Sequence, residues 1–124
     1  MAELTYTELQ TLVAEKLGII ADAESLSAEY ASVIQKHCTS VQSQLELMDI
    51  ASFVVEGGID TAYSDAFADL VAAQCADPFQ IQEPRRSYLN ANRLGMPNRS
   101  PAERRMRDLF IGTKQYTKHD VTVV

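Results

Sequence analysis

The sequence is poor in the side chains from which catalytic and metal sites are made. It contains only two histidines, His37 and His119, and two cysteines, Cys38 and Cys75. No CxxC pair and no cluster of cysteine with histidine is present, so a zinc site has no ligand set. His37 and Cys38 are neighbours in a predicted helix, where adjacent side chains point about 100° apart, which disfavours a Cys–His catalytic pair. We expect both cysteines to be buried and unbridged.

Other functional signatures are missing as well. The sequence has no GxSxG, Walker or HExxH motif, and the Gly57-Gly58 pair alone does not form a phosphate-binding loop. No apolar stretch approaches the roughly 20 residues that cross a bilayer. The start, Met1-Ala2-Glu3-Leu4, lacks the basic and apolar segments of a secretion signal. We therefore expect a cytoplasmic protein that is not an enzyme and needs no cofactor, no metal and no membrane.

Charge is distributed very unevenly along the chain. Residues 1–84 carry 14 acidic and two basic side chains, whereas residues 85–124 carry nine basic and three acidic ones. Such asymmetry suggests a charged partner for one part, although a dipolar surface without a special role is the alternative. Arginine favours fixed, bidentate pairs with carboxylates, and contact with nucleic-acid phosphates is the alternative. The basic residues include seven arginines: Arg85, Arg86, Arg93, Arg99, Arg104, Arg105 and Arg107.

The pattern of apolar residues and capping signals predicts an all-α fold, a bundle of four to five helices around one long helix. The 124 residues suffice for one domain with one core. The capping box Thr5-x-x-Glu8 starts a helix over residues 6–17, and Gly18 stands where a left-handed cap ends it. Ser27 caps a second helix that runs to Met48 and is about 30 Å long.

The second half of the chain predicts shorter helices. An extended or turn segment over residues 49–59 leads to Asp60, which caps an alanine-rich helix that ends at Asp77-Pro78. Pro84 is placed as the first residue of a fourth helix that runs to about Leu94, with Tyr88 and Leu89 as its apolar contacts. The capping box Ser100-Pro101-Ala102-Glu103 starts a last helix, which Gly112 ends. Its apolar edge consists of Met106, Leu109 and Phe110.

The end of the chain differs from the rest. We expect a helical domain over residues 1–112 and an extended docking tail over residues 113–124. The segment Asp120-Val121-Thr122-Val123-Val124 is β-prone and has no partner strand in its own chain, so it is suited to pair with the edge of another chain. A frayed terminus is the alternative.

Several segments together resemble one family. The segment Lys16-Leu17-Gly18-Ile19, an acidic linker and Leu26-Ser27-Ala28-Glu29 resemble the opening of the head-to-tail adaptor, or tail accessory factor, of tailed bacteriophages. Gly58-Ile59-Asp60-Thr61-Ala62-Tyr63 through Asp69-Leu70-Val71-Ala72-Ala73 to Asp77-Pro78-Phe79 resembles the third helix of that family and its end. The resemblance covers about residues 6–110. The chain departs from it at Asp60, where the family usually has proline, and at Gly95-Met96-Pro97, which interrupts the last helix.

The resemblance implies a structural virion protein at the head–tail junction, assembled in the host cytoplasm as a ring of about twelve copies. Such a ring joins the portal protein to a tail nozzle, hub or stopper protein, extends the channel for duplex DNA without reading its sequence, and retains the packaged genome. Two alternatives remain: a head-completion or tail-terminator protein at another level, and a small nucleic-acid-binding regulator that uses the arginines. In the adaptor, the contacts to the portal or a neighbouring copy would come from Arg99, Arg104, Arg105, Arg107, Tyr116, Val121, Val123 and Val124.

Overall fold

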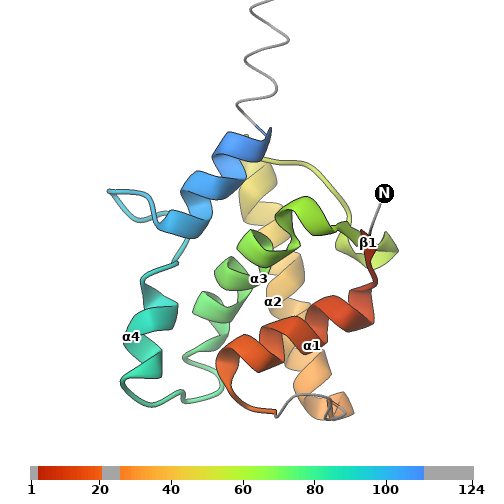
Figure 1. Cartoon of the computed structure of the whole chain (residues 1–124), viewed down its shortest axis with the longest axis vertical. Helices are drawn as coiled ribbons and strands as arrows, with labels where there is room; N and C mark the ends of the chain where they lie inside the picture. Colours follow the sequence, from red (N-terminus) through yellow and green to blue (C-terminus); the bar gives the residue numbers. More distant parts are fainter. Residues whose placement is uncertain (1–2, 21–25, 111–124) are drawn as a thin grey trace, which may run out of the picture.

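The computed structural model describes residues 3–20 and 26–110, which form a helical bundle (Figure 1). A two-stranded antiparallel sheet and a short 3-10 helix join the helices at one side. Residues 101–110 form a further helical segment. The predicted all-α fold is thus confirmed. In chain order the elements are β1 (Glu3–Leu4), α1 (Tyr6–Leu17), α2 (Ala28–Leu47), η1 (Val55–Gly57), β2 (Ile59–Asp60), α3 (Thr61–Cys75) and α4 (Arg85–Asn90).

Side-chain caps start the three longer helices where the sequence predicts them. The Thr5 hydroxyl accepts the Glu8 N–H at 3.1 Å, and the Glu8 carboxylate accepts the Thr5 N–H at 2.9 Å, which completes the capping box of α1. Ser27 accepts the N–H of Tyr30 at 3.2 Å in α2, and Asp60 accepts the N–H of Ala62 at 2.8 Å in α3. Local side-chain chemistry therefore fixes all three starts.

Helices α1 and α2, and the turn over residues 76–80 that follows α3, end in the Schellman motif, in which a left-handed residue is followed by one that bonds back to the preceding turn. The left-handed residues are Gly18 (φ 76°), Asp49 (φ 57°) and Gln80 (φ 53°). An isoleucine follows each of them, and its N–H bonds back to a carbonyl near the helix end. The bonds are Ile19 to Ala14 at 3.2 Å, Ile50 to Leu45 at 2.9 Å and Ile81 to Ala76 at 3.0 Å. All three isoleucines pack on or in the core, so each of these endings turns the chain back toward it.

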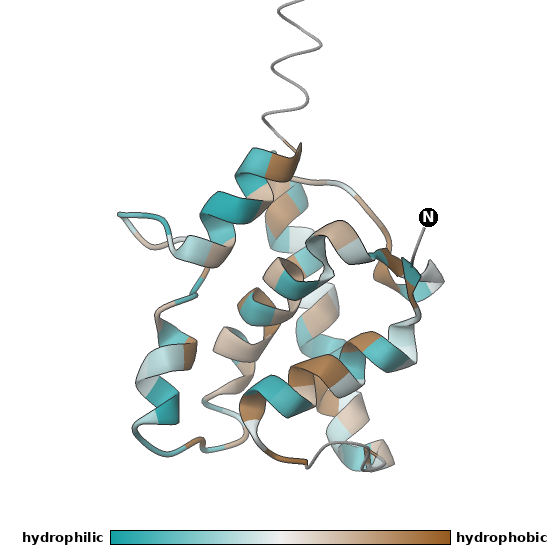
Figure 2. Ribbon diagram, in the orientation of Figure 1, coloured by the Kyte–Doolittle hydropathy of each residue, from teal (hydrophilic) through white to brown (hydrophobic). Residues whose placement is uncertain are grey.

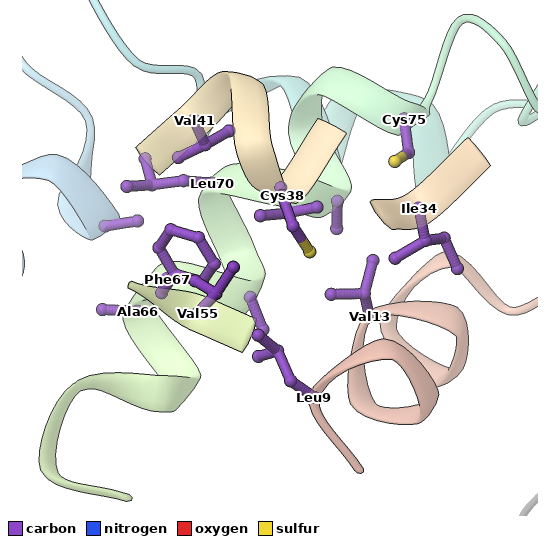
Figure 3. Packing of buried hydrophobic residues seen from close by; sticks show 14 of the residues in the cluster. Leu9, Val13, Ile34, Cys38, Val41, Val55, Ala66, Phe67, Leu70 and Cys75 are labelled. Carbon is purple, nitrogen blue, oxygen red and sulfur yellow. The ribbon is translucent and has the colours of Figure 1, made fainter. Parts of the chain in front are cut away.

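The core forms where α1, α2 and α3 meet (Figure 3). α2 is the longest helix, but α3 is buried along most of its length, and its small alanines let the neighbouring helices approach closely. Phe67 of α3 is fully buried, and Leu9 of α1 and Ile34 of α2 are among the other large side chains closed off from water. Both cysteines are buried and unbridged, as predicted.

α4 is shorter than predicted. It spans Arg85–Asn90 instead of continuing to Leu94, and Pro84 precedes its first residue. Beyond the helix, the Asn92 side chain accepts the N–H of Ala102 at 3.2 Å, which ties this turn to the last helical segment. Of the two predicted apolar contacts Leu89 is buried, but Tyr88 is 78% exposed.

The helical segment 101–110 covers the remaining side of the core. Its start at Ser100 is confirmed, because the Ser100 hydroxyl accepts the N–H of Glu103 at 3.2 Å. Met106 is fully buried as predicted, whereas Leu109 is 40% exposed. The predicted extended segment before α3 contains η1 and β2, and β2 pairs with β1 in a register that joins Leu4 to Ile59. The predicted stop at Gly112 lies outside the described residues.

Candidate functional site

The arginine region, defined as residues 85–107, forms one side of the bundle. α4 and the turns after it lie beside α3, and the helical segment 101–110 lies at the end of the bundle away from α1 (Figure 1). Hydrophilic residues dominate the helical segment 101–110, in contrast to the more apolar α3 beside it (Figure 2). This region contains all the arginines of the chain, so its ion pairs decide what it can bind.

Glu103 is the centre of the arginine region. Its side chain is only 2% exposed, and its carboxylate accepts the Gly95 N–H at 3.0 Å and the Arg107 Nε–H at 2.9 Å. Arg99 lies more loosely beside it, with Nε 3.9 Å from the same carboxylate. The predicted capping box is therefore only half formed: Glu103 turns inward, because two donors compete for its oxygens. This buried acid holds the turn at Gly95 against the last helical segment.

A second network joins three helices through Asp65 of α3. Lys16 of α1 lies 2.8 Å from Asp65 and 2.9 Å from Asp69, and Arg105 reaches Asp65 at 3.3 Å. The hydrogen bond from Lys16, followed by the charge of Lys16 and the bond from Arg105, lowers the pKa of Asp65 in spite of partial burial. Burial opposes the charge of Lys16, but its bonds to both aspartates outweigh this and raise the pKa of its ammonium. The network ties the last helical segment to α1 through α3.

α4 is fixed by a third set of contacts. Arg86 lies 2.6 Å from Asp77, and Arg93 lies 3.6 Å from the other oxygen of that carboxylate. Arg85 donates instead to the backbone carbonyl of Lys16 at 3.3 Å, at the C-terminal end of α1. A basic side chain is favoured there because the last carbonyls of a helix carry partial negative charge.

Five of the seven arginines thus meet acids of their own chain: Arg86, Arg93, Arg99, Arg105 and Arg107. Arg104 is exposed, and within residues 3–20 and 26–110 no acid lies at ion-pair distance from it. Three of the four predicted contact arginines are therefore engaged inside the fold, although Arg99 and Arg105 remain more than half exposed. The basic character of the region is weaker in three dimensions than along the sequence. Tyr116, Val121, Val123 and Val124 lie outside the described residues.

Sequence reasoning missed the acids that organise this region. The pairs of Glu103 with Arg99 and Arg107 have the i, i+4 spacing that brings helical side chains together, and this signal was available. Asp65 carries no such signal, because it is separated from Arg105 by 40 positions.

Both cysteines and His37 pack against other parts of the described chain. Burial raises the pKa of the Cys38 and Cys75 thiols to about 12, which keeps them protonated. His37 packs with its Nδ1 3.3 Å from the Gln74 side-chain oxygen, between α2 and α3. The described part of the chain contains no group of three or more metal-ligating side chains, and none of its helices has the length and hydropathy to span a membrane.

No protein-family model, no curated protein and no solved structure matches the chain. Function must therefore be inferred from the residues and their arrangement. The arginine region presents exposed guanidinium groups and an exposed tyrosine beside its internal ion pairs.

Proposed function

We propose that the chain is a head-to-tail adaptor of a tailed bacteriophage, a structural protein that forms a ring between the portal and the tail. The order of the resembling segments carries the proposal. Lys16-Leu17-Gly18-Ile19 forms the end of α1, Leu26-Ser27-Ala28-Glu29 the start of α2, and the alanine-rich segment forms α3. The segments that carry the resemblance are thus two helix boundaries and one whole helix of the core.

The distribution of charge supports a channel role over DNA binding. Fourteen acids lie within residues 1–84, and internal ion pairs already occupy most of the arginines. Acidic surfaces repel the phosphate backbone, so a lumen lined by such residues lets duplex DNA pass without holding it.

Contacts with the portal or a neighbouring copy would use the groups that the fold leaves available. Arg104 is exposed, and Arg99 and Arg105 keep 57% and 53% of their side chains exposed. A guanidinium has five N–H donors, so these two arginines can bind a second carboxylate while they keep their internal one. Arg107 is only 20% exposed and is bound to Glu103, so it is less accessible to a partner than Arg99 and Arg105. The apolar residues Val121, Val123 and Val124, with Tyr116, would dock on the portal.

Co-purification with the portal ring of the same virus tests the proposal. We expect the full chain to bind the portal and a chain that lacks residues 113–124 to lose this binding. Leu47→Ala is the matched control, because Leu47 is an apolar side chain that is 85% exposed on α2 and outside the arginine region. Failure of the full chain to bind would contradict the adaptor role, and binding by the shortened chain would contradict docking through the tail.

A nucleic-acid-binding regulator is the second candidate, favoured by the exposed Arg104 and Tyr88 on one side of the bundle. Titration of duplex DNA at several salt concentrations separates the two. A regulator loses decades of affinity as salt rises, because binding releases counterions from the phosphates. An adaptor shows almost no binding at low micromolar protein in any of these buffers, and Arg104→Gln changes nothing.

A further inference from the structure

An open groove of about 390 Å³ lies between α4 and the C-terminal end of α1. Pro84 and Leu89 give it apolar walls, Tyr88 stands beside them, and Lys16 and Arg85 supply two basic groups. Leu89 is 9% exposed and Tyr88 78% exposed, so an apolar floor lies next to a projecting aromatic ring. A protruding side chain of another molecule could bury its surface here.

The two basic groups of the groove differ in what they can still bind. The Lys16 ammonium is held between Asp65 and Asp69, so its charge is already compensated. Arg85 has only a carbonyl as its hydrogen-bond partner, and no acid in the described ranges lies at ion-pair distance from it.

The Arg85 guanidinium is exposed and lies against the C-terminal end of α1, where it donates to the Lys16 carbonyl. It packs so closely on Gly18 that a Cβ at that residue would lie 2.6 Å from the Arg85 Cζ. A guanidinium has five N–H donors, and this bond uses one of them. Arg85 is thus a cation beside the groove that still has donors for a carboxylate.

We propose that this groove is the docking site for a protein segment that carries a carboxylate beside a large apolar side chain. The carboxylate pairs with Arg85, with the parallel N–H bonds that guanidinium groups form. The apolar side chain packs on Leu89, Pro84 and the ring of Tyr88. Tyrosine and arginine around an apolar pocket are the residues that most often dominate binding at protein interfaces.

The position of the groove indicates which partner supplies this segment. α4 lies with the end of α1 at one end of the bundle, whereas the helical segment 101–110 ends at the opposite one (Figure 1). If the residues after 110 reach the portal, as the proposed function has it, the groove faces away from the portal. The docking segment then belongs to the tail-side partner. This assignment of the partner rests on the proposed function, whereas the chemistry of the groove is independent of it.

Chemical-shift titration of the full, ¹⁵N-labelled chain with two short peptides tests the chemistry. The probes are acetyl-Leu-Asp-Phe-amide and the same peptide with Asn in place of Asp. We expect shifts confined to the amides of Lys16, Arg85, Tyr88 and Leu89, and an affinity at least about tenfold higher for the Asp peptide, because a charged partner strengthens the bonds to Arg85. Tyr88→Ala should weaken binding about fivefold or more, whereas the equally accessible Leu47→Ala should not.

Several results would overturn the proposal: no shifts at millimolar peptide, shifts elsewhere, equal affinity for both peptides, or no effect of Tyr88→Ala. Self-association of the chain that Tyr88→Ala abolishes would also overturn it, since the occupant would then be a second copy. Tyr88→Ala should leave portal co-purification intact. If the chain binds the peptides but not the portal, the docking groove stands and the adaptor role is rejected. If it binds the portal but not the peptides, the adaptor role stands and the docking groove is rejected.

Discussion

Replacement of Glu103 by glutamine is the sharpest test of how the arginine region is held. The side chain keeps its size, but one of its two oxygens becomes an NH₂ group. Glu103 accepts the Gly95 N–H with one oxygen and the Arg107 Nε–H with the other. In the glutamine variant the NH₂ group takes the place of one oxygen, so one of these two N–H groups loses its acceptor. The site is buried, so water cannot easily replace the lost partner.

The expected loss follows from these contacts. A hydrogen bond to a charged group contributes about 1.5–3 kcal/mol, and removal of one partner of a fully buried ion pair costs about 3–5 kcal/mol. Arg107 is 20% exposed and can recover part of its hydration, so the lower range applies. We expect the free energy of unfolding to fall by about 2 kcal/mol and Tm to fall by about 8 °C for a domain of this size.

Urea denaturation followed by circular dichroism measures this loss as a lower midpoint at unchanged slope. Glu83→Gln is the matched control, because that carboxylate also accepts a backbone N–H, from Ser87 at 2.8 Å, but on an exposed part of α4. Its effect should be less than half as large, since water replaces the lost partner. Equal losses in the two variants would refute the role of the buried acid.

Four further predictions concern other contacts. Gly18→Ala should destabilise the fold by about 1–2 kcal/mol, measured by urea denaturation, since Gly18 is left-handed and its Cβ would displace Arg85. Gln80→Gly should raise stability by about 0.5–1 kcal/mol in the same assay by relieving a left-handed non-glycine residue. Lys16→Met should cost about 1 kcal/mol near neutral pH. The pKa of Lys16 is raised and that of Asp65 is lowered, so in pH-dependent melting this difference from wild type should disappear as pH rises through the pKa of Lys16 and as pH falls through the pKa of Asp65. Neither cysteine thiol should react with a thiol reagent at pH 8 until the chain is unfolded, because burial raises both pKa values to about 12.

The sequence predicts the helix starts better than the helix ends, for a physical reason. Thr5, Ser27 and Asp60 cap their helices through bonds to residues only two or three positions away, so the signal is local. Gly18 is equally readable as a left-handed cap. Asp49 and Gln80 are not, because their left-handed conformation depends on the burial of the isoleucine that follows each one. That burial exists only in the folded core.

The sequence predicts that arginines of this region pair with carboxylates, but it does not predict which acids they meet. A preference of arginine for carboxylates follows from the chemistry of the side chain, and it holds for five arginines within this chain. The identity of the acids depends on packing: Asp65 meets Arg105 only because the segment 101–110 lies on α3. The groove at α4 was invisible for the same reason, since α1 contributes one of its sides.

The place of Ala102 and Met106 in the core sets the order in which the fold can be completed. Both are closed off from water in the finished bundle, yet they are synthesised after α1, α2 and α3 have been made. A nascent chain that ends before them exposes the apolar surface that they cover, and Asp65 has not yet met Arg105. Partly folded chains with exposed apolar surface associate readily. Packing of Ala102 and Met106 is therefore the step that converts an association-prone chain into a closed bundle.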